Sequence, residues 1–142
     1  MILVLDASVT LAWQFKRVDP AEAVLAEQAL NELSTAQAIV PAIWYAEVAN
    51  GILRGERQGI LQPAQIAFFL NELAQTEIEI DEESPRTHQA GVLALARTLG
   101  LTTYDATYLE LAMRSGAVLA TFDRKLAAAA RAVGVPVFGD TQ

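Results

Sequence analysis

Four acidic residues stand at positions from which carboxylates could bind a cation: Asp6, Glu47, Asp105 and Asp123. Asp6 directly follows the short apolar run Ile2–Leu5, and Asp123 comes just after the apolar run Ala117–Thr121. Both runs are typical of strands that are buried on both faces of a parallel sheet. Ligands of such sheets bind at the carboxyl ends of the strands. If both strands are central, we expect the two carboxylates to meet at one edge of the sheet.

The charge of this group indicates its chemistry. Two carboxylates about 4 Å apart repel each other by on the order of 4 kcal/mol at an effective dielectric of about 20, so convergence requires protons or a cation. The sequence has no cysteine and a single histidine, His88, which excludes disulfides, thiolate nucleophiles, iron–sulfur clusters and histidine-rich zinc sites. Oxygen ligands favour Mg²⁺ or Mn²⁺. Such an ion supports hydrolysis of a phosphodiester by an activated water.

Each acid taken alone also has an ordinary interpretation. Asp105 can cap the helix that it is predicted to open. Asp6 and Asp123 can begin turns at the ends of strands. Glu47 shares one stripe of a predicted helix with other polar residues, which is typical of a solvated face. The metal hypothesis therefore depends on the four residues together.

The elements that would position these acids alternate between strands and helices. Short apolar or alternating runs predict strands at 2–5, 38–40, 77–81, 117–121 and 135–138. Helical spacing of apolar residues, bounded by Pro and Gly, predicts helices at 21–34, 43–57, from 63, 85–100, 105–116 and 124–133. The charged strand 77–81 and the strand that contains Pro136 suit the edges of a sheet. This alternation predicts an α/β domain with a central parallel sheet of about five strands.

The overall charge limits how the protein could meet nucleic acid. The chain has 17 acidic and 10 basic residues and a net charge of −7, so no global field attracts it to nucleic acid or to an anionic membrane. No segment approaches the roughly 18 apolar residues of a membrane span, and the N-terminal residues lack the pattern of a signal peptide. We therefore expect a cytoplasmic protein that meets no membrane.

Four short motifs contain the four acids. They are Asp6-Ala7-Ser8, Glu47-Val48-Ala49-Asn50, Asp105-Ala106-Thr107-Tyr108 and Thr121-Phe122-Asp123. In their order, spacing and element types they resemble the motifs of PIN-domain ribonucleases, and within that family those of the small VapC-like toxins of prokaryotic toxin–antitoxin pairs. The resemblance covers essentially the whole chain. It implies a single PIN-like domain over residues 1–142, with three layers, α/β/α, around the parallel sheet.

The same resemblance implies a function. The four acids would coordinate one or two Mg²⁺ or Mn²⁺ ions, and the protein would cleave single-stranded or loop RNA. Ser8, Asn50 and Thr121 would be supporting polar groups near the metal, which orient carboxylates or hold water. The resemblance also implies an antitoxin protein that blocks the site with an inserted segment, and a homodimer. The predicted helices at 21–34 and 42–75 carry enough apolar residues to form a dimer face.

Several other residues have less specific interpretations. Arg54 and Arg124, next to the motifs, could contact RNA phosphates. We expect Tyr108 to be structural, with a packed ring and a bonded hydroxyl. His88 is expected to be a core or rim side chain with one hydrogen bond. The aromatic residues at 13, 44, 45, 68 and 69 are expected to pack in the core or in an interface.

Three other functions remain open from the sequence. The chain could be a PIN nuclease that is not a toxin. Its residues 6–10 loosely resemble the first motif of haloacid-dehalogenase phosphatases, but Ser8 stands where that family has a second Asp, and Glu47 is left without a role. A non-catalytic Mg²⁺-binding domain, similar to a receiver, would keep the acidic edge, but Lys125, the nearest lysine, is not at the end of a late strand.

Overall fold

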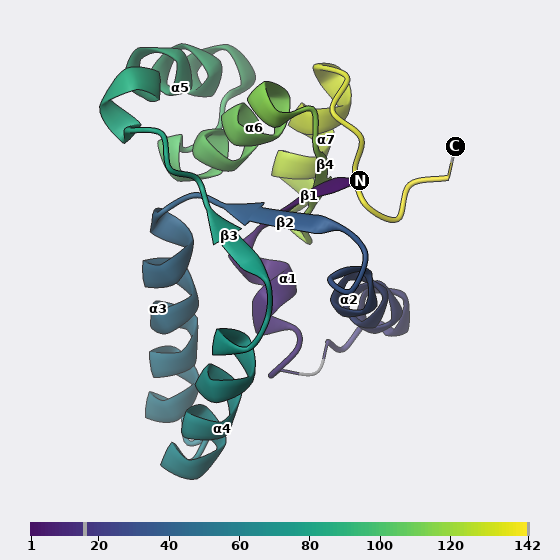
Figure 1. Cartoon of the computed structure of the whole chain (residues 1–142), viewed down its shortest axis with the longest axis vertical. Coiled ribbons are helices and arrows are strands. Elements are labelled where there is room, and N and C mark those ends of the chain that lie inside the picture. Colours follow the sequence, from purple (N-terminus) through teal and green to yellow (C-terminus); the bar gives the residue numbers. More distant parts are fainter. Residues whose placement is uncertain (16, 142) are drawn as a thin grey trace.

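The computed structural model describes residues 1–15 and 17–141. The strands within these residues are β1 (Ile2–Leu5), β2 (Gln37–Val40), β3 (Ile78–Ile80) and β4 (Val118–Ala120). The helices are α1 (Ala7–Leu11), α2 (Pro20–Glu32), α3 (Ile43–Arg57), α4 (Pro63–Ala74), α5 (Pro85–Leu99), α6 (Thr103–Ser115) and α7 (Arg124–Ala132). Strands and helices alternate along most of the chain, as the sequence predicts (Figure 1).

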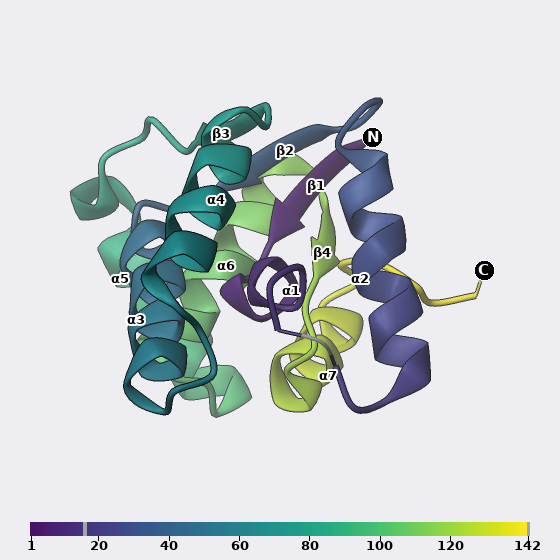
Figure 2. The ribbon, with the colours of Figure 1, turned by 90° about the horizontal axis from the view of Figure 1, so that it is seen from below.

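The strands form one parallel sheet in the order β3–β2–β1–β4. Figure 1 places α5, α6 and α7 on one side of this sheet and α1 to α4 on the other, and Figure 2 shows the second group from below. This arrangement confirms the predicted α/β fold with three layers and a central parallel sheet. Because β1 pairs directly with β4 and Leu5 lies in register with Ala120, the carboxyl ends of these two strands are adjacent.

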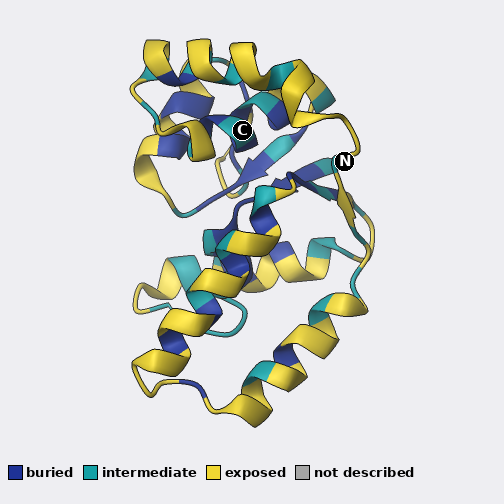
Figure 3. Cartoon of the chain, turned by 90° about the vertical axis from the view of Figure 1, so that its left-hand side faces the viewer, coloured by how far each residue is buried: buried dark blue, intermediate teal, exposed yellow. Residues whose placement is uncertain are grey.

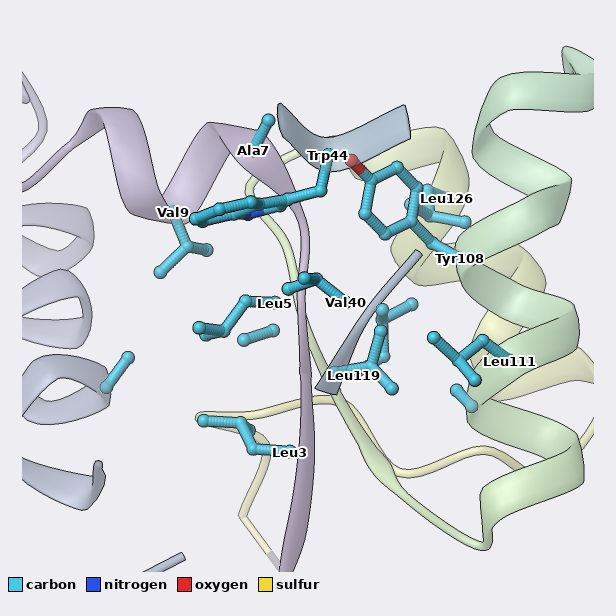
Figure 4. Close-up of a cluster of buried hydrophobic side chains, with 14 of the residues drawn as sticks. Leu3, Leu5, Ala7, Val9, Val40, Trp44, Tyr108, Leu111, Leu119 and Leu126 are labelled. Carbon is cyan, nitrogen blue, oxygen red and sulfur yellow. The ribbon is translucent and has the colours of Figure 1, made fainter. Parts of the chain in front are cut away.

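The hydrophobic core lies on both faces of the sheet. Residues 3–5 of β1 are fully buried, as expected for a continuous apolar strand between two layers of helices. Figure 4 shows Val9 and Trp44 on one side of the sheet and Tyr108 and Leu111, from α6, on the other. The outward faces of the helices are exposed (Figure 3). The sheet and its two layers therefore form a rigid base for the residues that follow the strands.

The C-terminal edge of the sheet differs from the prediction. The sequence predicts a central β4 and an edge strand at 135–138, but that strand is reduced to a single parallel bridge between Leu119 and Val137. The N–H of Leu119 donates to the Pro136 carbonyl, and the N–H of Phe138 donates to the Leu119 carbonyl. Pro136 has no N–H with which to extend the pairing. The predicted number of about five strands is thus approximately correct, with a bridge in the fifth place.

Helix α1 and the start of α6 also differ from the prediction. The sequence does not predict α1, because two of its five residues are β-branched and helix propensity is weak there. The sequence predicts that Asp105 opens α6, but α6 begins at Thr103. The Thr102 hydroxyl oxygen accepts a hydrogen bond from the Asp105 N–H at 3.1 Å, so Thr102 caps the helix. Asp105 lies in the first turn, where it is free of the capping role.

Helix α3 lies close against α1. A Cβ atom at Gly51 would overlap the end of the Leu11 side chain, so a larger residue there would force Leu11 to shift. The buried Trp44 indole N–H donates to the Thr10 hydroxyl at 3.2 Å. These contacts hold α3, which carries Glu47, next to the helix that follows β1.

The acidic segment around β3 contacts a basic side chain. Arg114 of α6 donates to Asp81 and Glu83 at 2.8 and 2.7 Å and to Glu110 at 3.0 Å. His88 of α5 is a half-buried rim side chain that is hydrogen-bonded to Glu83 at 3.0 Å, which agrees with the prediction. These charges link α5, α6 and the end of β3.

The aromatic residues are expected in the core or in an interface, and the structure places part of them in the core. Trp44 and Phe69 are buried, and the partly buried Trp13 donates through its indole N–H to the Ala26 carbonyl at 2.8 Å. Tyr45 and Phe68, on α3 and α4, are exposed. No helix in the described ranges 1–15 and 17–141 is long and apolar enough to cross a membrane.

Candidate active site

Asp6 lies at the C-terminal end of β1 in a network of hydrogen bonds that joins β1 to β4. Its Oδ2 accepts hydrogen bonds from the Ser8 hydroxyl at 2.8 Å and the Thr121 hydroxyl at 2.6 Å. In turn, the Phe122 N–H donates to the Ser8 oxygen and the Asp123 N–H donates to the Thr121 oxygen. Asp6 is only 6% exposed. Burial raises the pKa of its carboxyl, while the two hydroxyl hydrogen bonds oppose the rise.

Asp123 lies at the start of α7. Its Oδ1 accepts a hydrogen bond from the Leu126 N–H at 2.9 Å, which caps the helix. Asp123 is exposed, and its charge raises the pKa of the carboxyls of Asp6 and Asp105. The capping bond fixes the side chain while Oδ2 makes no hydrogen bond within the described residues. The strand-end placement of Asp6 and Asp123 is therefore as the sequence predicts.

Glu47 is held from the opposite side of the sheet. The Tyr108 hydroxyl of α6 donates to Glu47 Oε1 at 2.6 Å. Burial raises the pKa of the Glu47 carboxyl, the Tyr108 hydrogen bond lowers it, and the charge of Asp6 raises it. The Tyr108 side chain is fully buried, and burial together with Glu47 raises the pKa of its hydroxyl, which therefore keeps its proton and acts as a donor. The predicted packed ring and bonded hydroxyl are confirmed.

The pKa of the Asp105 carboxyl reflects its burial and the charges of the other three acids. Burial is the largest cause that raises the pKa of its carboxyl to about 6, and the charges of Asp123, Asp6 and Glu47 each raise it further. The Thr102 hydroxyl opposes the rise. The four predicted acids, at the ends of two strands and on two helices, therefore lie near enough for the charges of the other three to act on Asp105.

The donor set fits a hard divalent cation. Across residues 1–15 and 17–141, no lysine, arginine or histidine forms an ion pair with any of the four carboxylates. Uncompensated carboxylates that raise one another's pKa are stabilised by a cation that takes oxygen ligands. In the described part of the chain, no three Asp, Glu or His side chains are placed closely enough to hold a metal ion as they stand.

The other predicted site residues lie around this cluster. Ser8 and Thr121 hold Asp6, as described above. Asn50 is exposed one turn after Glu47 on α3, and its side chain makes no hydrogen bond within the described residues. Arg54 and Arg124 are exposed and line a groove of about 780 Å³ that also includes Ser8. The sequence does not predict the hydrogen bond between Tyr108 and Glu47, because these residues lie 61 positions apart.

We expect the stability of the metal-free protein to fall as the pH rises from about 5 to 7.5. Asp105 has a pKa of about 6 in the folded protein against an ordinary 3.8, so its stabilising contribution is complete below about pH 3.8 and is lost as the pH rises through 6. The raised pKa values of Asp6 and Glu47 act in the same direction. Asp81, whose pKa is lowered by Arg114, contributes stability that is already complete above its ordinary pKa.

Thermal unfolding in EDTA at pH 5.0 and 7.5 measures this effect. The variant Asp105→Asn should show a smaller loss of Tm between the two pH values than the wild-type chain. Equal losses in both proteins, or a wild-type Tm that is highest at pH 7.5, would contradict the proposed repulsion.

Removing the Tyr108 hydroxyl should leave the Glu47 carboxylate without this hydrogen-bond donor and therefore less fixed in position. For Tyr108→Phe we expect a loss of about 1 kcal/mol in stability, or about 3–5 °C in Tm, and a roughly tenfold weaker affinity for Mn²⁺, as for other groups that orient a metal ligand. Unfolding curves and Mn²⁺ titrations measure the two effects. Tyr104→Phe, on the exposed face of the same helix, is the matched control. Unchanged Mn²⁺ affinity in Tyr108→Phe would restrict that hydroxyl to a structural role.

Comparison with known proteins identifies the family. The PIN domain family model matches residues 3–132. Ribonuclease VapC3 of Pyrobaculum aerophilum is 32% identical over 127 residues, which cover 89% of this chain and 93% of that protein. Ribonuclease VapC3 of Mycobacterium tuberculosis is 34% identical over 135 residues, which cover 93% of this chain and 92% of that protein.

Two solved structures share the fold. PAE2754 from Pyrobaculum aerophilum has a TM-score of 0.69 at 24% identity, over 91% of this chain and 84% of that chain. FitAcB from Neisseria gonorrhoeae has a TM-score of 0.62 at 23% identity, over 98% of this chain and 97% of that chain. The family match over most of the sequence and relatives above 30% identity agree with the motifs around the four acids. The chain belongs to the PIN domain family.

Proposed function

We propose that this chain, as one PIN domain over residues 1–142, is a cytoplasmic, divalent-metal-dependent endoribonuclease that hydrolyses phosphodiester bonds in RNA and is the toxin of a toxin–antitoxin pair. The observation that carries the proposal is that the charges of Asp6, Glu47 and Asp123 add to burial in raising the pKa of Asp105. None of the four carboxylates has a basic ion-pair partner among the described residues. The relatives named Ribonuclease VapC3, similar over most of their length, support RNA as the substrate.

In this proposal the four acids hold one or two Mg²⁺ or Mn²⁺ ions. When bound, the ion supplies an activated water and stabilises negative charge on the phosphodiester. The chain's own residues position the ligands: Ser8 and Thr121 fix Asp6 through Oδ2, and Tyr108 fixes Glu47 through Oε1. Because these donors are fixed before the substrate arrives, the carboxylates need little reorganisation.

Other polar residues are assigned to the substrate. Asn50, exposed beside Glu47, would hydrogen-bond RNA or an ordered water, and Arg54 and Arg124 would contact phosphates. Two divalent ions would neutralise the four acids and change the net charge of −7 to −7 + 4 = −3. RNA binding would then depend on the metal site and on local arginines rather than on a global field.

The partners in the proposal are an antitoxin and a second copy of the chain. Helices α3 and α4 expose Tyr45, Leu53, Phe68 and Leu70, and a cavity of about 270 Å³ lies between them and β3. Apolar side chains gathered in this way are typical of a protein interface. Light scattering of the purified chain tests the homodimer directly: a dimer mass supports it and a monomer mass contradicts it.

Cleavage assays separate the proposed nuclease from its alternatives. The purified chain should cut unpaired RNA with Mn²⁺ or Mg²⁺, should lose this activity in EDTA, and should leave a phosphomonoester intact. Hydrolysis of the phosphomonoester instead would favour a phosphatase. Metal binding without any hydrolysis would favour a non-catalytic cation-binding domain.

Growth measurements separate a toxin from a nuclease of another role. Induced expression of the wild-type chain in a bacterial host should arrest growth, whereas the Asp6→Asn variant at the same expression level should not. Equal growth with both proteins, together with metal-dependent RNA cleavage in vitro, would support a PIN nuclease that is not a toxin.

A further inference from the structure

An open groove of about 780 Å³ runs away from the four acids on the side of the sheet that carries α1. Figure 2 shows α1 between α3 and α2 on this side. One wall is formed by α3, from Gly51 to Gln58, and the other by residues 17–22, with α1 between them. Ser8 and Arg124 lie at the end next to Asp6 and Asp123. The groove is thus continuous with the candidate active site.

The floor of the groove is apolar and closely packed. It includes Leu11, Ala12 and Phe15. A Cβ atom at Gly55 would overlap the Phe15 ring, so a glycine is required for α3 to approach this ring. The groove is thus lined by an aromatic ring together with charged side chains.

The arginines along this rim are not equivalent. Arg17 donates to Glu22 at 3.0 Å and its guanidinium lies 4.8 Å from the centre of the Phe122 ring, so its charge is already compensated and it forms part of the wall. Arg54 and Arg124 come from α3 and α7, and in the described part of the chain neither forms an ion pair.

The acids on the same rim are partly compensated as well. Glu22 is paired with Arg17. Asp19 caps α2 and accepts a hydrogen bond from the Ala21 N–H at 2.9 Å, where the positive end of the helix dipole offsets its charge. The groove therefore has two arginines available for an anionic ligand although the whole chain is acidic.

We propose that this groove binds an unpaired segment of RNA, a few nucleotides long, on one side of the bond that is cut. The inference rests on the proposed ribonuclease function and adds the path of the substrate. Arg54, on the α3 wall, and Arg124, at the end next to the acids, contact backbone phosphates, and a base lies against the Phe15 ring. Positive side chains that follow the backbone, combined with an aromatic ring on which a base stacks, are the features with which proteins bind single strands.

The dimensions favour an unpaired strand over a duplex. A groove of about 780 Å³ is in the size range of sites that enclose a small ligand. Double-stranded RNA is instead recognised across the broad surface of its minor groove. A base-paired segment would also be unable to place a base against the ring at the floor.

Binding of a fluorescein-labelled, unstructured RNA octamer, followed by anisotropy in Mg²⁺, tests this inference. The Asp105→Asn protein serves as the parent so that the RNA stays intact. Adding Arg54→Gln and Arg124→Gln should raise the Kd about a hundredfold, or about tenfold for each charge-assisted hydrogen bond that is lost. It should also reduce the slope of log K against log salt by about 1.4, or 0.7 for each lost phosphate contact.

Arg57→Gln is the matched control, because Arg57 is an exposed arginine on the same helix outside the groove. It should leave the Kd and the salt slope unchanged, and a perfectly paired duplex of the octamer should bind more weakly than the single strand. The inference is overturned if the parent does not bind the octamer, if Arg54→Gln with Arg124→Gln binds like the parent, or if Arg57→Gln weakens binding equally.

The same experiment distinguishes this inference from the proposed function. Loss of binding on substitution of the two arginines, in a chain whose wild-type form cuts no RNA, would support the groove and contradict the nuclease. If the wild-type chain cleaves RNA in a metal-dependent way but substitution of both arginines leaves the Kd for RNA unchanged, the result supports the nuclease and contradicts RNA binding in the groove.

Discussion

Asp6→Asn should lower RNA cleavage by about a thousandfold, the effect of removing several kcal/mol of transition-state stabilisation by a metal ion. The substitution replaces one anionic oxygen ligand by an amide and keeps the shape of the side chain. The amide oxygen can still accept the hydrogen bonds that Ser8 and Thr121 donate to Asp6 Oδ2. We therefore expect the fold to be retained.

The stability of the same variant separates a binding role from a structural one. Burial raises the pKa of the Asp6 carboxyl, which means that the folded protein disfavours its ionised form. In EDTA at pH 7.5, the Tm of Asp6→Asn should equal that of the wild type or exceed it by about 2–5 °C. Asp140→Asn, the same chemical change at a surface pair with Arg131, should leave cleavage unchanged. A Tm that falls by more than about 5 °C in Asp6→Asn would make Asp6 a structural residue.

The second large effect is the stabilisation of the folded chain by a divalent cation. A ligand that binds only the folded state, at about 100 times its Kd, adds about 2.7 kcal/mol to the free energy of unfolding. For a chain of this length we expect Mn²⁺ to raise the Tm by about 10 °C. The four acids repel one another in the metal-free chain, as the raised pKa of Asp105 indicates, and the ion removes that repulsion.

Thermal unfolding with and without Mn²⁺ measures this stabilisation. The double variant Asp6→Asn with Glu47→Gln should respond to Mn²⁺ by no more than about 2 °C. Glu72→Gln, an exposed acid on α4, should respond like the wild type. An equal response in the double variant would place cation binding elsewhere on the protein.

Local chemistry explains which parts of the fold could be predicted from the sequence. The apolar run Ile2–Leu5 is buried on both faces, and Ser84 followed by Pro85 begins α5 as a helix cap and first residue. Gly100 ends that helix with a φ of 67°, a conformation that glycine adopts without strain. In each case neighbouring residues determine the structure, so the sequence pattern suffices.

Long-range packing explains what could not be predicted. Helix α1 is short and has weak propensity, and its position depends on the contact between Leu11 and Gly51 of α3. A second difference has a local cause: Thr102 caps α6, so Asp105 lies in the first turn rather than at the helix start.

In the candidate site, too, local sequence predicts some features, whereas others depend on long-range packing. The strand ends predict Asp6 and Asp123, because adjacent parallel strands bring their carboxyl ends together. The hydrogen bond from Tyr108 to Glu47 joins residues 61 positions apart, and nothing in the periodicity of either helix predicts that pairing. The groove that includes Arg54 and Arg124 likewise depends on how α3, α1 and α7 are placed around the sheet.

Calorimetric titration of Mn²⁺ into the purified chain at pH 7.5 tests most directly whether the four acids form one cation site. The wild-type chain should bind one or two ions, and in a second titration at about pH 6.0 it should also release protons, because Asp105 has a pKa of about 6 in the metal-free protein. Asp105→Asn should bind at least about tenfold more weakly, and Glu72→Gln should bind like the wild type. Mn²⁺ binding that is equally tight in Asp105→Asn, or absent from the wild-type chain, would contradict the proposed metal site.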